Sequence, residues 1–166
     1  LASELYPLRR DLPRLNSTLI EAYAAEPSRA AMQKVRAETK KAQDPFELRV
    51  MASHGGTISI EAKELATTLV SGPIGGVVGG QALAERMKLP NVLCTDIGGT
   101  SFDIALITDG RFDITPTPDI ARFMLNMPLV RIDSIGAGTG SFGRVNRTSN
   151  RPELGPDSAS SRIGVS

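Results

Sequence analysis

The chain has 166 residues, of which 40% are hydrophobic and 22% are charged, and 19 Lys and Arg residues against 18 Asp and Glu give a net charge of +1. This length supports one domain with a sizeable core, and the balanced charge offers no electrostatic footprint for nucleic acid or for an anionic membrane surface. One cysteine excludes an intrachain disulfide framework and fits a reducing compartment. No apolar run approaches the 18 or more residues of a membrane span, so a cytoplasmic protein without nucleic-acid or membrane partners is expected.

The N-terminal part carries helical periodicity. Asn16 or Ser17 can cap a helix, and the Glu26-Pro27 step is expected to end it. Ser28 can cap a second helix that runs on to about residue 42. The apolar face predicted for the first helix consists of Leu15, Leu19, Ile20 and Tyr23. Residues 1–70 are interpreted as a helical scaffold with one strand.

That strand is predicted at 46–52, where apolar residues alternate, and it runs into the polar loop Ser53–Thr57. A double glycine and a polar loop at a strand end make a second candidate ligand contact. His54, in this loop, is the only histidine, so no second histidine exists to form a metal pair with it.

The segment 71–80 is rich in glycine and leads into a helical pattern that continues to Met87. A serine hydroxyl and glycine amides at a helix N-terminus can bind an anion, which makes Ser71, Gly72, Gly75 and Gly76 candidate contacts. The alternative is structural: the pairs Gly75 with Gly79 and Gly76 with Gly80 are spaced four residues apart and would let a helix pack closely on its neighbour.

The clearest motif is DIGGTSFD at 96–103, between a predicted buried strand at 92–95 and a second strand at 102–108. Adjacent glycines let backbone N–H groups approach an anion, the following hydroxyls add donors, and Asp96 could hold a hydrated Mg²⁺ or orient a water. The candidate phosphate contacts are Gly98, Gly99, Thr100 and Ser101. An ordinary tight hairpin remains the alternative.

After a turn at Asp109-Gly110, a further strand is predicted at 129–135, followed by the loop GAGTGS at 136–141. It is another strand that ends in glycines and a hydroxyl. Ser141 stands where a dinucleotide-binding fingerprint needs its last glycine, and the chain has no Gly-Lys pair for a P-loop. Both of those nucleotide motifs are therefore excluded.

The DIGGTSFD segment resembles the phosphate hairpin of the actin-like ATPase superfamily. With SHGGTIS at 53–59, SGPIGGVVGG at 71–80 and SIGAGTGSFGRV at 134–145, the chain is similar to the hydantoinase A/oxoprolinase family over about residues 12–166. His54, Thr139 and Phe142 resemble the branch of acetone carboxylase beta subunits and acetophenone carboxylases.

The resemblance implies a fold and cofactors. The fold class is α/β, a mixed sheet with flanking helices, as one lobe of an actin-like (ribonuclease H-like) ATPase, with residues 71–166 as its glycine-rich nucleotide-binding part. ATP and Mg²⁺ are the implied cofactors. Asp96 would hold Mg²⁺ or act on water as the catalytic residue, with Gly98 to Ser101 around a phosphate, and Asp103 would brace the hairpin. The nucleoside or its α-phosphate would be approached by Gly136, Gly138, Gly140 and Ser141.

The resemblance also implies what surrounds this lobe. Family members are several times longer and carry an N-terminal lobe with its own hairpin, so that lobe, other carboxylase or hydrolase subunits and a small-molecule substrate are the expected partners. A start at Leu1 predicts a fragment, which is expected to be inactive alone. Three functions stay open: an ATP-dependent ketone carboxylase (a ligase) that phosphorylates an enolate and bicarbonate, a cyclic amide hydrolase of the hydantoinase or 5-oxoprolinase type, and a non-catalytic scaffold.

Overall fold

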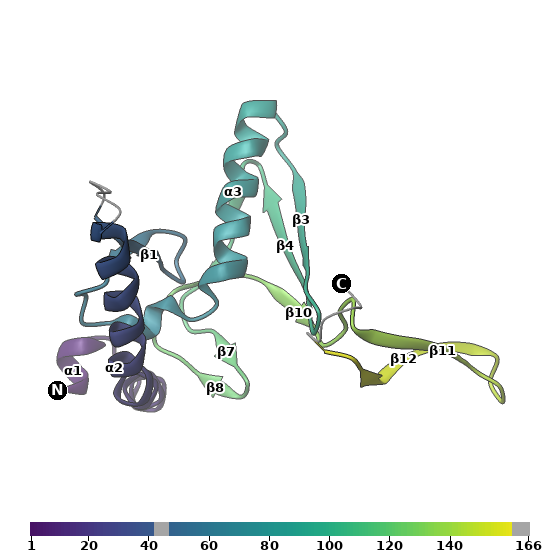
Figure 1. Cartoon of the computed structure of the whole chain (residues 1–166), viewed down its shortest axis with the longest axis horizontal. Helices are drawn as coiled ribbons and strands as arrows, with labels where there is room; N and C mark the ends of the chain where they lie inside the picture. The colour runs from purple at the N-terminus through teal and green to yellow at the C-terminus, as the bar shows by residue number, and fades with distance from the viewer. Residues whose placement is uncertain (42–46, 161–166) are drawn as a thin grey trace. The chain divides into compact units, whose positions relative to one another are not determined.

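The computed structural model describes residues 1–41 and 47–160, and these form two compact units (Figure 1). Unit 1 consists of Leu1–Val78 and Asp113–Arg131, and unit 2 of Gly79–Phe112 and the chain from Ile132 onward. The helix α3 (Ser71–Met87) begins in unit 1 and ends in unit 2. The chain is a mixture of helices and sheets, as predicted. Within the described ranges, no helix is both long enough and apolar enough to cross a membrane.

Unit 1 combines helices with short antiparallel strand pairs. Its helices are α1 (Ala2–Leu5), α2 (Asp11–Lys41), the 3-10 helix η1 (Leu65–Thr68) and the first half of α3. Its strand pairs are β1 (Arg49–Met51) with β2 (Thr57–Ser59), β6 (Ile114–Thr115) with β9 (Leu129–Val130), and β7 (Asp119–Ile120) with β8 (Phe123–Met124). The largest fully buried apolar side chains of this unit are Ile60, Ile74, Leu125, Met127 and Val130. Phe46, the first residue of the predicted strand, lies outside the described residues.

The predicted break at Pro27 is wrong, because α2 continues through it. Proline inside a helix removes one hydrogen bond and costs about 3 kcal/mol. Pro27 is exposed, so water can reach the carbonyl that it leaves unpaired. Contacts on both sides of the proline hold the helix: Glu21 is buried, and Arg29 donates to the carbonyls of Ile60 and Ala62 at 2.6 and 2.9 Å.

The predicted apolar face of α2 is also wrong. Leu15, Leu19 and Tyr23 are 53%, 55% and 87% exposed, while Pro13, Ser17 and Glu21 are the buried residues of this helix. Ser17 Oγ accepts a hydrogen bond from the amide of Asn126 at 2.8 Å. The helix therefore contacts the rest of unit 1 largely through polar side chains.

Glu21 is the most completely bonded of these polar side chains. Its carboxylate accepts hydrogen bonds from Tyr6 Oη at 3.0 Å and from the amides of Leu65 and Ala66 at 3.0 and 2.7 Å. These amides belong to the first turn of η1, where a helix lacks internal acceptors. Burial, with the Glu21 carboxylate beside it, raises the pKa of Tyr6 well above its ordinary value. Glu21 thus connects α2 to η1 and to Tyr6, the residue that follows α1.

Ser53 connects its loop to two further segments of unit 1. Its side chain is fully buried, its amide donates to the carbonyl of Thr67 at 2.6 Å, and its hydroxyl donates to the carbonyl of Pro128 at 2.8 Å. Its own carbonyl accepts from the amide of Val130 at 2.7 Å. This residue of the predicted ligand loop therefore has a structural role.

Unit 2 is built on an antiparallel sheet in the order β10 (Asp133–Ile135), β4 (Phe102–Thr108) and β3 (Val92–Ile97), with β5 (Arg111–Phe112) paired to β4. The prediction for β4 and for the Asp109-Gly110 turn is confirmed. The single strand predicted at 129–135 is wrong, since this segment divides into β9 and β10.

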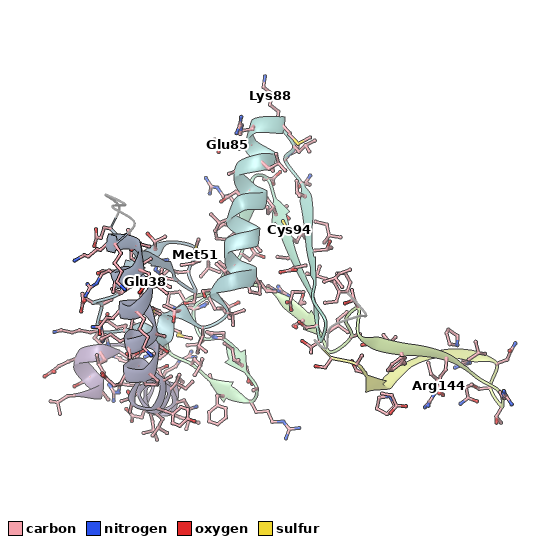
Figure 2. All side chains as sticks on the ribbon, in the orientation of Figure 1. Glu38, Met51, Glu85, Lys88, Cys94 and Arg144 are labelled. Atoms are coloured by element: carbon pink, nitrogen blue, oxygen red, sulfur yellow. The ribbon has the colours of Figure 1, made fainter. Side chains whose placement is uncertain are left out.

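The second half of α3 packs against this sheet through Gly80. A Cβ placed on Gly80 would lie 2.6 Å from Cys94 Sγ and 3.8 Å from Ile107 Cδ1, and Figure 2 labels Cys94 on β3 beside α3. Burial raises the pKa of the Cys94 thiol. Glycine at position 80 is therefore explained by close approach of the helix to the sheet, the structural alternative considered above.

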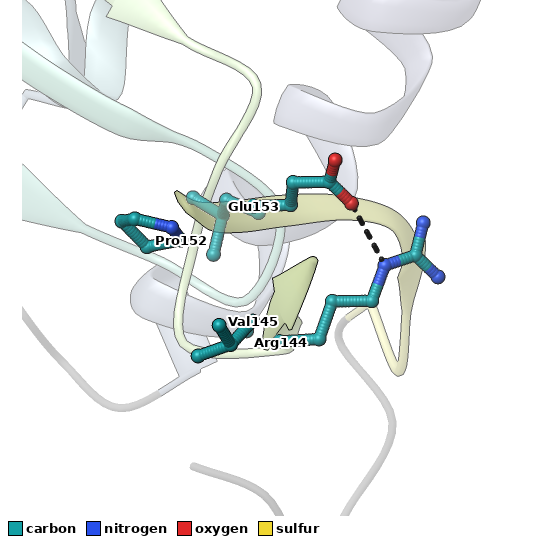
Figure 3. Close-up of a pocket in the computed structure, with 6 residues that line it drawn as sticks. Arg144, Val145, Pro152 and Glu153 are labelled. Atoms are coloured by element: carbon teal, nitrogen blue, oxygen red, sulfur yellow. Dashed lines mark hydrogen bonds and ion pairs between the residues drawn. The ribbon is translucent and has the colours of Figure 1, made fainter. Parts of the chain in front are cut away.

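The hairpin of β11 (Ser141–Asn146) and β12 (Arg151–Ser158) completes unit 2. Its register places Val145 opposite Pro152 and Arg144 opposite Glu153, and directly opposite residues share a face. Arg144 Nε donates to Glu153 Oε2 at 3.2 Å (Figure 3). The hairpin consequently has one charged face and one apolar face, the latter including Leu154.

Candidate phosphate-binding site

The DIGGTSFD motif places two carboxylates side by side. Asp96 was predicted to follow the strand, but it lies inside β3, directly opposite Asp103 of β4. Asp103 is in turn opposite Ser134 of β10. Facing residues of an antiparallel pair have Cβ atoms about 4.5–5.5 Å apart, so Asp96, Asp103 and Ser134 form a polar row across one face of the sheet.

This row has the donor chemistry of a site for a hard cation. Asp96 is exposed and Asp103 is half-buried. Ser101 Oγ lies 3.5 Å from Asp103 Oδ2, which supports a weak bracing contact of the predicted kind. Over residues 1–41 and 47–160 no cluster of three or more His, Cys, Asp or Glu side chains forms a metal cage. Carboxylate oxygens supplemented by water match the way Mg²⁺ is bound beside phosphates.

In the turn between β3 and β4, the 136–141 loop donates hydrogen bonds to two carbonyls, and three amides have no acceptor among the described residues. The amide of Gly98 donates to the carbonyl of Ser101 at 3.0 Å, and the carbonyls of Gly98 and Gly99 accept from the amides of Thr139 and Gly140 at 2.9 and 3.1 Å. Among the described residues, no acceptor contacts the amides of Gly99, Thr100 and Ser101. Consecutive N–H groups without an internal acceptor are available to donate to an anion.

Glycines of the 136–141 loop allow the loop to contact this turn. A Cβ on Gly138 would lie 2.7 Å from the carbonyl carbon of Gly99 and 2.8 Å from the nitrogen of Thr100. A Cβ on Gly140 would lie 2.7 Å from the oxygen of Gly99. Ser141 Oγ accepts from the amide of Gly138 at 3.0 Å and so stabilises the loop itself. The loop thus supports the turn, and its own contact to a nucleoside or α-phosphate stays a prediction.

A pocket of about 480 Å³ lies beside the turn in unit 2. It is formed by the turn, the 136–141 loop and the base of the β11–β12 hairpin. The sequence identified Thr100, Gly136 and Ser141 as site residues but missed the residues of β12 and the turn after it. The residues that line the pocket are Thr100, Ile135, Gly136, Ala137, Ser141, Leu154, Gly155, Pro156, Ser158 and Ser160.

The glycine-rich segment 71–80 is helical rather than a loop, since α3 begins at Ser71. A Cβ on Gly72 or Gly76 would meet no described atom within 4 Å, and one on Gly75 would lie 4.0 Å from Met51 Cε. Ser71, Gly72, Gly75 and Gly76 belong to unit 1. Their contact to substrate or phosphate stays a prediction.

His54 is exposed, and its Nδ1 accepts a hydrogen bond from the amide of Gly56 at 3.1 Å. A Cβ on Gly56 would approach this imidazole ring to 2.5 Å. His54 therefore stabilises its own loop.

The chain is similar to known proteins over nearly its whole length. The sequence model of the hydantoinase/oxoprolinase family matches residues 14–166. The acetone carboxylase beta subunit of Xanthobacter autotrophicus is 52% identical over 164 residues, which are 99% of this chain and 23% of that subunit. A nucleotide-free structure of acetone carboxylase, from a study of ATP-dependent acetone carboxylation, aligns with a TM-score of 0.83 at 52% identity over 99% of this chain and 23% of that one.

The ATP-dependent caprolactamase of Pseudomonas jessenii gives a TM-score of 0.79 at 26% identity, over 95% of this chain and 23% of that one. The chain thus spans about a quarter of the length of these relatives.

Proposed function

Because the chain belongs to the hydantoinase/oxoprolinase family, we propose that its unit 2 binds the phosphates of ATP, as part of one lobe of an actin-like (ribonuclease H-like) ATPase fold. The carrying observation is the β3–β4 turn, whose amides at Gly99, Thr100 and Ser101 have no acceptor among the described residues. The paired carboxylates Asp96 and Asp103 lie on the two strands that flank this turn. Amides for the anion and carboxylates for its counter-ion are the two requirements of a phosphate site.

The chemistry assigned to this site is positioning and charge stabilisation. Phosphoryl transfer depends mainly on fixed donors around the phosphate oxygens. The turn amides donate to these oxygens, and the hydroxyls of Thr100 and Ser101 add donors beside them. Asp96 and Asp103 would hold Mg²⁺, which neutralises phosphate charge when bound. Asp96, the exposed member of the pair, would also orient a water molecule.

For the whole protein we propose an ATP-dependent ketone carboxylase, in which a ketone enolate and bicarbonate are phosphorylated. The higher identity to the acetone carboxylase subunit supports this substrate class. The alternative is an ATP-dependent cyclic amide hydrolase, which the similarity to caprolactamase supports. Residues of the rest of the polypeptide and of further subunits would select the substrate, and this lobe alone would not catalyse turnover.

The proposed ATP site is tested by calorimetric titration with Mg-ATP, Mg-ADP and AMP. Asp96→Asn should weaken binding of Mg-ATP and Mg-ADP, because it removes the charge of one of the paired carboxylates. Asp109→Asn is the matched control, since Asp109 is an exposed residue at the far end of β4 with a positive φ that asparagine also tolerates. Equal affinities of wild type and Asp96→Asn would contradict the role of Asp96.

If the folded intact protein binds no nucleotide, the non-catalytic scaffold is the correct alternative. If it does bind, the substrate class is decided by ATP consumption in the intact protein with its subunits. Dependence on a ketone plus bicarbonate would support the carboxylase, and dependence on a lactam or hydantoin would support the hydrolase.

A further inference from the structure

One face of α2 carries large apolar side chains that are exposed. These side chains, called the α2 stripe below, belong to Leu12, Leu15, Leu19 and Tyr23, which are 63%, 53%, 55% and 87% exposed. Their spacing of three or four residues places them in one row along an α-helix. Single exposed leucines are common on protein surfaces, but a continuous apolar surface of several side chains indicates an interaction site.

The α2 stripe lies on the side of the helix away from the rest of unit 1. The buried residues of α2 are Pro13, Ser17 and Glu21. Leu15 and Leu19 each lie about 160° around the helix from Ser17. The described part of unit 1 therefore packs on the opposite face of α2 and leaves the stripe accessible.

The α2 stripe has no charge over about three turns of helix. From Leu12 to Tyr23 the charged residues are Arg14 and Glu21. Arg14 forms an ion pair with Asp11 of the first turn, and Glu21 is buried. The solvent face of a surface helix usually carries charged and polar residues, so this face has the composition of a packed surface.

The shape of the α2 stripe fits a second helix. Steps of three and four residues approximate the a and d positions of a heptad, which form a narrow seam between two helices. A helix that packs on a larger core usually has a wider apolar face. From Leu12 to Tyr23 the stripe is about 17 Å long. Its occupant is therefore expected to be an amphipathic helix of at least about three turns.

The remaining polypeptide is the source of such a helix that the comparisons favour. The chain spans 23% of the acetone carboxylase beta subunit that it matches, so most of that subunit lies outside the match. A segment of the same polypeptide has a much higher effective concentration at this surface than a separate molecule has. We propose that the α2 stripe is covered by an amphipathic helix of the same polypeptide from outside residues 1–166. This inference does not depend on the proposed ATP site.

Photo-cross-linking of the intact protein tests this inference. Tyr23 is replaced by the photoreactive residue p-benzoylphenylalanine, which keeps an aromatic side chain at this position. The same photoreactive residue at Val35 is the matched control, because Val35 is 52% exposed on α2 but lies about 160° around the helix from Leu19. After irradiation, denaturing electrophoresis gives the mass of the product, and mass spectrometry identifies the linked peptides.

We expect the photoreactive residue at position 23 to link to a peptide outside residues 1–166 while the mass of the chain stays that of one copy. The control at position 35 should not link to that peptide. The double variant Leu15→Gln with Leu19→Gln, folded by circular dichroism, should lose the link from position 23, because its leucines no longer form the seam.

Four results would overturn the inference. A product with the mass of two copies would show that a second copy covers the stripe, and a product with the mass of the chain plus another subunit would show that a partner protein does. A link only to residues 1–166 would place the occupant inside this chain. The absence of any link from position 23, or an unchanged link in the folded double variant, would show that no helix packs on these leucines.

Discussion

The contact between the 136–141 loop and the phosphate turn gives a quantitative prediction for Gly138→Ala. The added Cβ would lie 2.7 Å from the carbonyl carbon of Gly99 and 2.8 Å from the nitrogen of Thr100. These are backbone atoms, which cannot rotate away as a side chain can. Overpacking costs about 1–3 kcal/mol, and displacing the loop also weakens the two hydrogen bonds from Thr139 and Gly140, each contributing about 1 kcal/mol. We expect a loss of about 2–4 kcal/mol in the free energy of unfolding.

Gly136→Ala is the control within the same loop, because a Cβ on Gly136 meets no described atom within 4 Å. Its expected effect is within about 0.5 kcal/mol. The free energies of unfolding of both variants and of wild type are measured by urea denaturation. Equal stability of Gly138→Ala and Gly136→Ala would refute the argument that glycine at position 138 serves close backbone contact.

The other predictions concern buried groups and a helix. Glu21→Leu leaves three donors without their acceptor and should lower the free energy of unfolding by about 3–5 kcal/mol, with Glu21→Gln losing less in the same urea titration. The pKa of Tyr6 is raised on folding. The contribution of Tyr6 to the free energy of unfolding is therefore complete below the ordinary tyrosine pKa of about 10 and declines as pH rises further. Between pH 8 and 11, the free energy of unfolding from urea denaturation should therefore fall more steeply with pH for wild type than for Tyr6→Phe. Equal slopes would contradict this prediction. Gly80→Ala should lower the free energy of unfolding by about 1–3 kcal/mol. The double variant Gly80→Ala with Cys94→Ala should recover this stability, because the sulfur that the new Cβ would contact is removed. Gly76→Ala should stabilise α3 by about 0.5–1 kcal/mol, because a Cβ at this position meets no described atom within 4 Å. A lower Tm in thermal denaturation would show that this position is not open.

The hairpin of β3 and β4 was predictable because an apolar run at 92–95 and alternating apolar residues at 102–108 flank a turn with two adjacent glycines. The spacing of Asp96 and Asp103 about this turn also fixes them as partners across the ladder, although only the structure assigns them to one face. Local pattern and tertiary structure agree on the two strands and their turn, but the burial predicted for the first strand is wrong, since β3 is largely exposed, and Asp96 lies inside β3.

In α2 the local signals and the tertiary contacts disagree. Pro27 is a valid stop signal in isolation, but Glu21 and Arg29 attach the helix to unit 1 on either side of it. The leucines at 15 and 19 looked like a core face, yet they are exposed and the buried positions carry serine and glutamate. The buried face of a helix that packs through polar side chains cannot be predicted from the periodicity of its apolar residues.

The pocket could not be predicted from motifs. Leu154 and Pro156 approach the turn only because β12 returns antiparallel to β11 in a particular register, and no spacing in the sequence specifies that return. The hydrogen bonds from the amides of Thr139 and Gly140 to the carbonyls of the β3–β4 turn could not be predicted from the sequence either. The glycines of this loop were predicted as ligand contacts, which stays a prediction. Packing supplies a second reason for glycine at positions 138 and 140, which sequence inspection could not distinguish from ligand contact.

The hydrogen bonds of Ser53 have a consequence for the kinetics of folding. The bond from Ser53 to Pro128 spans 75 positions, and unit 1 consists of two stretches separated in sequence by residues 79–112 of unit 2. Contacts between distant positions are slow to form, because the chain entropy of closing the loop is lost before the contact stabilises the structure. A ribosome must therefore synthesise the chain beyond Val130 before this serine can find all its partners. Until then the loop at 53–57 lacks its buried anchor, and unit 1 is expected to mature after the β3–β4 hairpin, whose strands adjoin in sequence.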